Sequence, residues 1–275
     1  MDSKVKMIAL DLDRTTLKDS KTMSDATAET LERAGEMGTM VVIATGRVYD
    51  ALPDIVHELS SVKYFICSNG ASVFDAETGD IIFEKCLESE AVETMVACVR
   101  EKNFMFESFT GGYAYIGRDY FEMVRDRKLP YRGRDYVLAT RTPVDDIFGF
   151  TLEHKDRIEN LNVFFPDQEE KEEMRGKLSV IPDSVLTSSI PSNLELGGNG
   201  VSKGAALSFL MERESMTRES LMAVGDSPND LSMLELAAYP VAVGNAEQEV
   251  KDAAIYIAPT NEEDGVADAI RKYVF

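Results

Sequence analysis

Two parts of the chain, one at each end, alternate short apolar runs with segments of helical periodicity. Short apolar runs predict buried strands, and strands separated by helices predict right-handed crossovers and a parallel sheet. Ser24 is suited to cap the first helix and Gly38 to follow its end. The predicted strands are 5–12, 39–44, 64–68, 221–224, 240–243 and 255–258; the predicted helices are 24–37, 48–59, 202–213, 230–238 and a last one from about 265.

The middle of the chain has a different pattern. Runs at 71–74 and 80–84 flank Glu77-Thr78-Gly79, which predicts a hairpin. From 86 to 190, β-like runs such as 161–165 mix with charged helices such as 167–178. We therefore predict an α/β protein whose core is built from residues 1–85 and 191–275, with an inserted α+β domain at 86–190.

Composition narrows the possible partners. The chain has 275 residues, a hydrophobic fraction of 44% and a net charge of −20. Such a charge repels nucleic acid and anionic lipid, so we expect neither as a partner. A phosphorylated small molecule is still a possible substrate if a bound cation or a local basic pocket offsets the negative electrostatic potential of the protein. We expect a monomer or a weak homodimer.

Cysteine use and the start of the chain suggest a location. Cys67, Cys86 and Cys98 form neither an even set nor a C-x-x-C pair, which fits a reducing compartment. The first residues contain no secretory leader, and no apolar stretch is long enough to span a membrane. We therefore expect a cytoplasmic protein.

Candidate chemistry follows the predicted core strands. In open α/β sheets, ligands bind beyond the carboxyl ends of the strands. Side chains suited to chemistry occupy these places: Asp11 and Asp13 after the first strand, Thr45-Gly46-Arg47 after the second, Lys203 at a helix start, and Asp226, Asn229 and Asp230 after the fourth. We expect them to meet at one rim of the sheet.

This set suits phosphoryl transfer, which needs a nucleophile, a metal and donors for the phosphoryl oxygens. Asp11 is the candidate nucleophile, because a carboxylate can form a covalent phospho-enzyme. Asp13 can protonate the leaving oxygen and later activate water. Asp11 and Asp226 offer the oxygen ligands that Mg²⁺ prefers, and Thr45 and Lys203 can hold the transferring group.

The four segments, in this order, resemble the motifs of the haloacid dehalogenase superfamily. Further segments are similar to its Cof-type hydrolases: Ala44-Thr45-Gly46-Arg47, Ser68-Asn69-Gly70-Ala71, Gly200-Val201-Ser202-Lys203-Gly204, Gly244-Asn245-Ala246 and Asn261-Glu262-Glu263-Asp264-Gly265-Val266-Ala267. The resemblance implies a Rossmann-like core, an inserted cap, and Mg²⁺-dependent hydrolysis of phosphate monoesters, often sugar phosphates.

The resemblance also implies roles for individual residues. Asp11 is the nucleophile and Asp13 the general acid and base; Mg²⁺ is held by Asp11, the Asp13 carbonyl and Asp226, with support from Asn229 and Asp230. Phosphate contacts fall to Thr45, Gly46, Lys203 and Asn229, and candidate substrate contacts are Arg14, Arg47 and Asn69. Arg14 replaces the usual Gly, and it would be strained if that position required a positive φ. Thr16 replaces the usual Leu.

Several alternatives stay open at this point. The same core suits a phosphotransferase or mutase, which analysis for free phosphate would separate from a phosphatase. A phospho-receiver or an inactive sugar-phosphate binder is also considered. Residues 109–113 are either a substrate loop or a turn between strands. The basic excess at Arg118, Arg125, Arg127, Lys128, Arg132 and Arg134 either attracts an anion or is a solvated surface.

Overall fold

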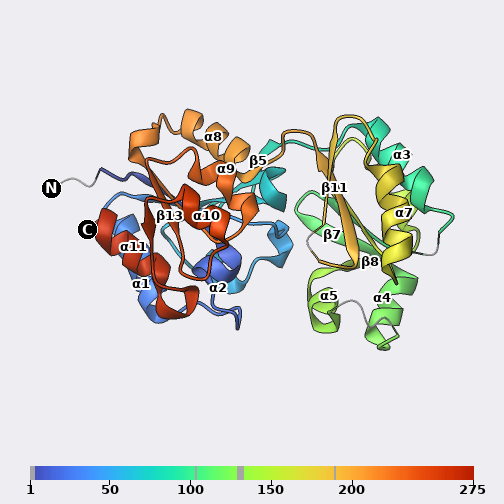
Figure 1. Ribbon diagram of the computed structural model, residues 1–275, viewed down its shortest axis with the longest axis horizontal. Helices are drawn as coiled ribbons and strands as arrows, with labels where there is room; N and C mark the ends of the chain where they lie inside the picture. The colour runs from blue at the N-terminus through green and yellow to red at the C-terminus, as the bar shows by residue number, and fades with distance from the viewer. Residues whose placement is uncertain (1–3, 103, 129–132, 189) are drawn as a thin grey trace. The chain divides into compact units, whose positions relative to one another are not determined.

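The computed structural model describes residues 4–102, 104–128, 133–188 and 190–275 (Figure 1). It has a mixed α/β fold and divides into two compact units. The first unit comprises Met1–Arg47, Leu52–Phe83 and Ser202–Phe275, and the second comprises Val48–Ala51 and Glu84–Val201. Among the described residues, no helix is long and apolar enough to cross a membrane.

The first unit is built on an eight-stranded sheet. Its order is β14-β13-β12-β1-β2-β3-β4-β5, and neighbours from β14 to β3 are parallel, whereas β4 is antiparallel to β3. The parallel core sheet predicted from the apolar runs is therefore confirmed. The strands are β1 Met7–Asp11, β2 Met40–Ala44, β3 Val62–Cys67, β4 Ser72–Asp75, β5 Ile81–Glu84, β12 Leu221–Gly225, β13 Tyr239–Ala242 and β14 Tyr256–Ile257.

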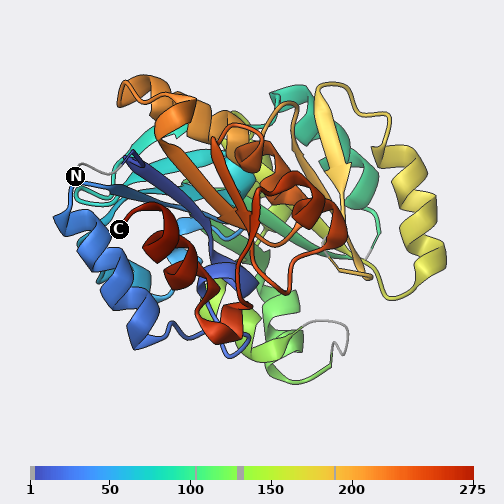
Figure 2. The same ribbon diagram turned by 60° about the vertical axis from the view of Figure 1, so that its left-hand side comes forward.

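Helices cover both faces of this sheet, as its buried apolar strands require. In both views α1 and α11 lie side by side on one face, and α8, α9 and α10 cover the other (Figures 1 and 2). The helices are α1 Asp25–Glu36, α2 Asp54–His57, α8 Lys203–Arg213, α9 Leu231–Leu234, α10 Gln248–Ala253 and α11 Gly265–Tyr273; short helical turns lie at Leu12–Thr16, Tyr49–Ala51, Ser68–Gly70, Arg218–Ser220, Pro228–Asp230 and Asn261–Glu263.

Helix boundaries follow local capping chemistry. Ser24 accepts a hydrogen bond from the Thr27 amide at the start of α1, and Gly38 has a φ of +84° after its end, as predicted. The single helix predicted at 48–59 is wrong. Pro53 caps α2, and the residue before a proline is disfavoured in helical conformation, so the segment forms two short pieces.

The second unit contains a six-stranded sheet of order β10-β11-β9-β6-β7-β8. Pairs among β10, β11, β9, β6 and β7 are antiparallel, and β7 and β8 are parallel. Its elements are α3 Ser89–Val99, β6 Met105–Thr110, β7 Tyr113–Gly117, α4 Arg118–Arg125, α5 Arg134–Thr140, β8 Thr142–Val144, α6 Ile147–Glu153, β9 Ile158–Phe164, α7 Gln168–Leu178, β10 Ser184–Thr187 and β11 Asn193–Gly198. Gly111 and Gly112 have positive φ and form a turn between β6 and β7.

Two hydrophobic clusters hold this unit together. One joins Phe106, Leu161 and Leu194 of the sheet to apolar residues of α3, α6 and α7. The other joins Met105 and Phe164 to residues of α4 and α5. Because alternate residues of a strand face opposite sides, the two clusters lie on opposite faces of the sheet. The second unit thus combines a mostly antiparallel sheet with helices packed on both of its faces.

The unit boundaries differ from the predicted domain limits by residues 84–85, which fall in the second unit, and by longer segments at two further places. Residues 191–201, assigned to the core from the sequence, lie in the second unit, because β11 pairs with β9 and β10. Residues 48–51 also belong to the second unit, where Val48 and Ala51 pack against Ala114. The two longer differences arise from contacts between residues far apart in the sequence.

Candidate active site

The ends of β1 and β12 lie side by side and bring two of the acids together. Leu10 pairs with Val224 in parallel register, so Asp11 and Asp226 stand at almost the same level. The chain leaves β1 toward β2 on one side and later adds β12 on the other. This reversal of strand order is the switch point at which open α/β sheets bind ligands.

Lys203 links two of the site carboxylates. Its Nζ lies 2.5 Å from Oδ1 of Asp11 and 2.6 Å from Oδ1 of Asp230. All three residues are buried. Burial alone would lower the pKa of Lys203, but the charges of Asp11 and Asp230 raise it above its ordinary value. Lys203 is therefore a permanent buried cation.

Burial also shifts the acids. It raises the pKa of Asp11 to about 7, against the opposing charge of Lys203. It likewise raises the pKa of Asp226. Loss of water disfavours the charged form of a carboxyl group, which is the physical cause in both cases. A further positive charge beside Asp11 and Asp226 would favour the ionised form of both carboxyl groups.

Asp230 holds the loop after β12. Its Oδ2 accepts hydrogen bonds from the amides of Asp226 (2.9 Å) and Ser227 (3.0 Å), while its Oδ1 faces Lys203. Both carboxylate oxygens are therefore occupied. This favours a supporting role for Asp230 over direct metal ligation.

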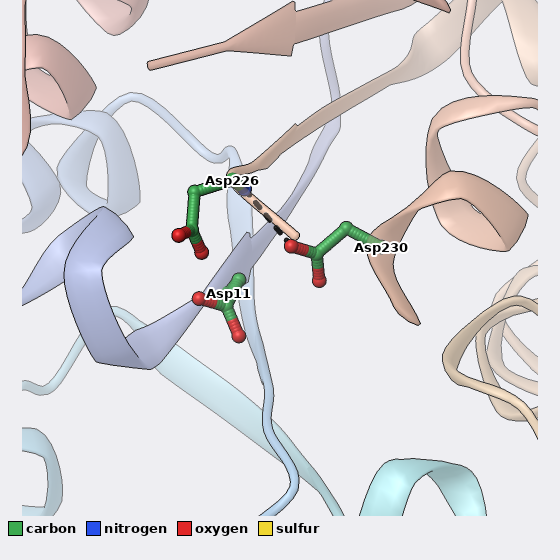
Figure 3. Close-up of side chains that lie close together, drawn as sticks. All are labelled: Asp11, Asp226 and Asp230. Carbon is green, nitrogen blue, oxygen red and sulfur yellow. Dashed lines mark hydrogen bonds between the residues drawn. The ribbon is translucent and has the colours of Figure 1, made fainter. Parts of the chain in front are cut away.

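Asp11, Asp226 and Asp230 form an acidic group in which Asp11 and Asp226 have oxygens available to a cation, while Asp230 supports the loop and Lys203. One carboxylate oxygen of each lies within 4.8 Å of the others. Figure 3 shows the three carboxylates turned toward one another, with the Asp226 amide bonded to Asp230. Oδ1 of Asp226 accepts a hydrogen bond from Thr15 at 3.2 Å, but its buried Oδ2 accepts none from any residue that the structure describes. A buried acceptor of this kind calls for a partner, and hard oxygen donors suit Mg²⁺.

The Asp13 carboxylate is turned to a different set of partners. Arg47 donates from Nε to Oδ2 at 2.8 Å and from Nη2 to Oδ1 at 2.7 Å, and Lys21 donates from Nζ at 2.9 Å. Burial would raise the pKa of Asp13, but these bonds and charges outweigh it and lower the pKa to about 2. Asp13 is therefore ionised at neutral pH in this conformation. Its carboxylate is not part of the acidic group described above.

Residues after β2, β3 and β12 line the neighbouring part of the rim. Thr45 is buried, and its Oγ1 accepts a hydrogen bond from the Arg47 amide. Asn229 donates to Oδ1 of Asn69 at 2.9 Å. A Cβ on Gly46 would lie 3.1 Å from that same oxygen, so glycine permits the close approach.

Arg14 has a φ of 62° and a ψ of 7°, which is the left-handed conformation that glycine adopts most easily. The condition under which the sequence predicts strain at this position is therefore met. Asn245 donates to the Arg14 carbonyl at 2.8 Å and holds the loop in this shape. The Arg14 side chain reaches back to Asp226, with Nη1 3.6 Å from Oδ2.

Sequence reasoning gave no role to three residues that contact the site. Thr15 donates to Asp226, and its position two residues after Asp13 is the sequence feature that could have indicated this contact. Thr16 donates from Oγ1 to the Asp11 carbonyl at 2.6 Å and closes the turn after β1. Lys21 contacts Asp13 only because a turn brings it back, and nothing in the local sequence predicts that contact.

The basic excess in the second unit is largely matched by nearby acids. Arg118 pairs with Asp145, Arg134 with Asp135, and Lys128 with Asp126. Arg125 pairs with Glu122 on the same helix. These pairs favour the solvated-surface interpretation of this segment. Arg132 lies outside the described residues.

Comparison with known proteins fits this fold and site. The family model of the haloacid dehalogenase-like hydrolases matches residues 8–270. The chain is 32% identical to the 5-amino-6-(5-phospho-D-ribitylamino)uracil phosphatase YcsE of Bacillus subtilis over 99% of this chain and 97% of that one. It is 31% identical to the phosphatase YwpJ of the same organism, over 97% and 99% of the two chains.

A solved structure has the same architecture. A haloacid dehalogenase-like hydrolase from Bacteroides thetaiotaomicron superposes with a TM-score of 0.83 at 29% identity, covering 98% of this chain and 99% of that one. The fold and the acidic site define a hydrolase with an α/β core and an inserted domain. The chain belongs to the haloacid dehalogenase-like hydrolases, in their Cof-type branch, and is an enzyme of the phosphatase type.

Proposed function

We propose that the protein hydrolyses a small phosphate monoester through an aspartyl-phosphate on Asp11, with Asp13 as general acid and base and with Mg²⁺ as cofactor. The observation that carries this proposal is the grouping of Asp11, Asp226 and Asp230 around the buried Lys203. A nucleophilic carboxylate, a fixed cation and free oxygen ligands at one point are what phosphoryl transfer requires.

Asp11 is the residue that would attack phosphorus. Lys203 holds its Oδ1, which fixes the direction of the other oxygen. A bond then forms between that oxygen and phosphorus, while the bond from phosphorus to the substrate oxygen breaks. The alcohol leaves, and phosphate stays on Asp11 as an acyl phosphate.

The Mg²⁺ site would use Asp11, Asp226 and the Asp13 carbonyl, with Asp230 and Asn229 in support. The buried Oδ2 of Asp226, which accepts no hydrogen bond from the described residues, supports this assignment. When bound, Mg²⁺ neutralises charge on the phosphoryl group and favours the ionised form of the nucleophile.

Asp13 would move protons in both halves of the reaction. It gives a proton to the leaving oxygen in the first half and takes one from the attacking water in the second. Water then bonds to phosphorus, and the bond from phosphorus to Asp11 breaks. Because Arg47 and Lys21 hold Asp13 ionised, the acid step requires Asp13 to separate from them and take up a proton first.

Thr45, Gly46, Lys203 and Asn229 would surround the phosphoryl oxygens. Fixed donors in a partly buried site stabilise the developing charge, by roughly 3–4 kcal/mol each where such donors have been removed from other enzymes. Arg47 and Asn69 are the candidate substrate contacts next to these residues. The Arg47 amide donates a hydrogen bond to Thr45, and Asn69 accepts one from Asn229.

The substrate class is inferred from relatives. The B. subtilis relative is named for a phosphate ester of a ribityl chain joined to a pyrimidine ring. This name favours a phosphorylated sugar or a similar phosphorylated metabolite as the substrate of the present chain. The basic segment at 118–134 is not assigned to substrate, because its described cations are largely paired with acids.

The test is release of inorganic phosphate from a panel of esters. The panel contains sugar phosphates, 5-amino-6-(5-phospho-D-ribitylamino)uracil, flavin mononucleotide, pyridoxal phosphate, phosphoglycolate and p-nitrophenyl phosphate. Each ester is assayed with Mg²⁺, with EDTA, and with the Asp11→Asn variant. Release that needs both Mg²⁺ and Asp11 supports the proposal, with a loss on the order of 10⁴-fold or more expected for Asp11→Asn.

The same panel separates hydrolysis from the alternative reaction. A phosphotransferase or mutase would form a new ester in the presence of a sugar acceptor, with little free phosphate. Metal-independent release, or normal turnover by Asp11→Asn, would contradict the mechanism.

A further inference from the structure

Arg14 stands at the metal side of the site in a conformation that is unfavourable for arginine. Its φ of 62° would suit glycine, and the backbone is fixed from outside by the Asn245 amide. The turn is also closed by Thr16, which donates to the Asp11 carbonyl. The loop therefore imposes this conformation whatever side chain is present, and an arginine here suggests a role for its charge.

The guanidinium of Arg14 approaches a buried carboxylate oxygen that accepts no hydrogen bond from the described part of the chain. Nη1 of Arg14 lies 3.6 Å from Oδ2 of Asp226, which accepts no hydrogen bond from the described residues. The other oxygen, Oδ1, is taken by Thr15. At 3.6 Å the contact is electrostatic and leaves Oδ2 available as a ligand.

Charge balance explains why a cation is needed there. Asp11, Asp226 and Asp230 are three acids, and Lys203 is the cation buried among them. Arg14 adds a second positive charge, so the metal-free site keeps a small net charge. A divalent cation would bring two more charges to the same oxygens, and it would repel the guanidinium.

Arg14 is also free to leave. Its side chain is 51% exposed, whereas that of Asp226 is 3% exposed. A long, half-exposed side chain can swing into water at little cost, but the buried carboxylate cannot follow. Movement of Arg14 is therefore the response expected when another cation enters.

We propose that Arg14 is a built-in counter-ion of the metal-free site, which a divalent cation must displace from Asp226 and which therefore weakens Mg²⁺ binding. This inference rests on the proposed Mg²⁺ site. Separating Arg14 from Asp226 costs free energy, and this cost lowers the net affinity of the site for Mg²⁺. When no metal is bound, the positive charge of Arg14 partly neutralises the acids and helps to keep the site formed.

The test is calorimetric titration of the full-length protein with Mg²⁺, in wild type and in Arg14→Asn, Arg14→Lys and Asp226→Asn. Asparagine is neutral and tolerates the left-handed conformation, so Arg14→Asn removes charge without adding strain. Arg14→Lys keeps the charge. For a half-exposed ion pair we expect Arg14→Asn to bind Mg²⁺ about fivefold more tightly than wild type. Arg14→Lys should stay within about twofold of wild type, and Asp226→Asn should lose binding.

Thermal unfolding gives a second readout that needs no turnover. In EDTA, loss of the counter-charge of Asp226 and relief of the left-handed strain at position 14 act in opposite directions on the melting temperature, so the readout for Arg14→Asn is the shift that Mg²⁺ causes. Added Mg²⁺ should raise the melting temperature of Arg14→Asn by more than it raises that of wild type. Arg14→Lys should behave as wild type in both conditions.

Three results would overturn the inference. Equal or weaker Mg²⁺ binding by Arg14→Asn would mean that Arg14 does not compete with the ion. Tighter binding by Arg14→Lys, equal to that of Arg14→Asn, would mean that shape and not charge matters. Absence of Mg²⁺ binding in wild type would remove the metal site itself and with it this part of the proposed function, whereas the first two results leave that function intact.

Discussion

Nζ of Lys203 lies 2.5 Å from Oδ1 of Asp11, and both side chains are almost completely removed from water. The pair joins the start of α8 to the end of β1, two points 192 residues apart in the chain. A buried ammonium that also contacts Asp230 orients the candidate nucleophile and stabilises the site.

Replacing Lys203 by methionine should therefore destabilise the protein as well as impair catalysis. Removing one partner of a buried pair leaves uncompensated charge, and we expect the free energy of unfolding to fall by about 3 kcal/mol. Urea denaturation at neutral pH in EDTA measures this. The matched control is Lys63→Met at an exposed position of β3, where we expect a change within about 0.5 kcal/mol. Equal losses in the two variants would mean that the Lys203 contacts contribute nothing.

The Asp11 pKa of about 7 predicts how stability depends on pH in the absence of metal. A carboxyl whose pKa is higher in the folded than in the unfolded state stabilises the protein at low pH, and this contribution is lost as pH rises from about 4 to about 7. In EDTA, the free energy of unfolding of wild type should fall between pH 5 and pH 7.5, on the order of 2 kcal/mol more than that of Asp11→Asn.

Urea denaturation of both proteins at these two pH values tests the expectation. With Mg²⁺ added, the free energy of unfolding of wild type should rise with pH over this range, because the ion binds the carboxylate form of Asp11. A metal-free wild type whose free energy of unfolding changes between pH 5 and pH 7.5 by the same amount as that of Asp11→Asn would contradict the raised pKa.

Asp13→Asn should slow breakdown of the phospho-enzyme more than its formation. Loss of a general base lowers the rate by about 10²- to 10⁴-fold, and phosphate should then accumulate on Asp11. Rapid-quench experiments with a radiolabelled substrate would detect the accumulated acyl phosphate. Asp80→Asn, an exposed acid between β4 and β5, is the control and should turn over normally. Unchanged turnover in Asp13→Asn would remove this residue from the acid–base role.

The second unit contains a buried ion pair that should matter for stability. Nη2 of Arg141 lies 3.1 Å from Oε2 of Glu107, and their side chains are 4% and 0% exposed. The Arg141 guanidinium also lies over the rings of Phe109 and Tyr136. Arg141→Met should lower the free energy of unfolding by about 3–5 kcal/mol, since Glu107 would stay buried without this partner.

An exposed pair in the same unit provides the comparison. Arg118 and Asp145 form an ion pair with side chains 52% and 85% exposed. Arg118→Met should change the unfolding free energy by less than about 1 kcal/mol, because water and salt screen such pairs. Thermal unfolding of both variants measures the difference, and similar melting temperatures would show that burial of the Arg141 pair adds nothing.

Much of the fold could be predicted because its elements obey local rules. Apolar runs gave the core strands, and Ser24 and Gly38 marked the ends of α1. The segment 48–59 was predicted wrongly, since Pro53 interrupts a pattern that otherwise has helical periodicity. The place of residues 191–201 depends on β11 pairing with β9, and such long-range pairing leaves no local trace.

By itself, the sequence determined which residues stand at the strand ends, because strand periodicity and capping are local properties. It placed Asp11, Asp13 and Asp226 after predicted strands and Lys203 at a predicted helix start, and these places made them candidate site residues. Tertiary structure alone decided how these charges are shared. Burial and distance set each pKa and each ion pair, and both depend on packing between segments as far apart as β1 and α8.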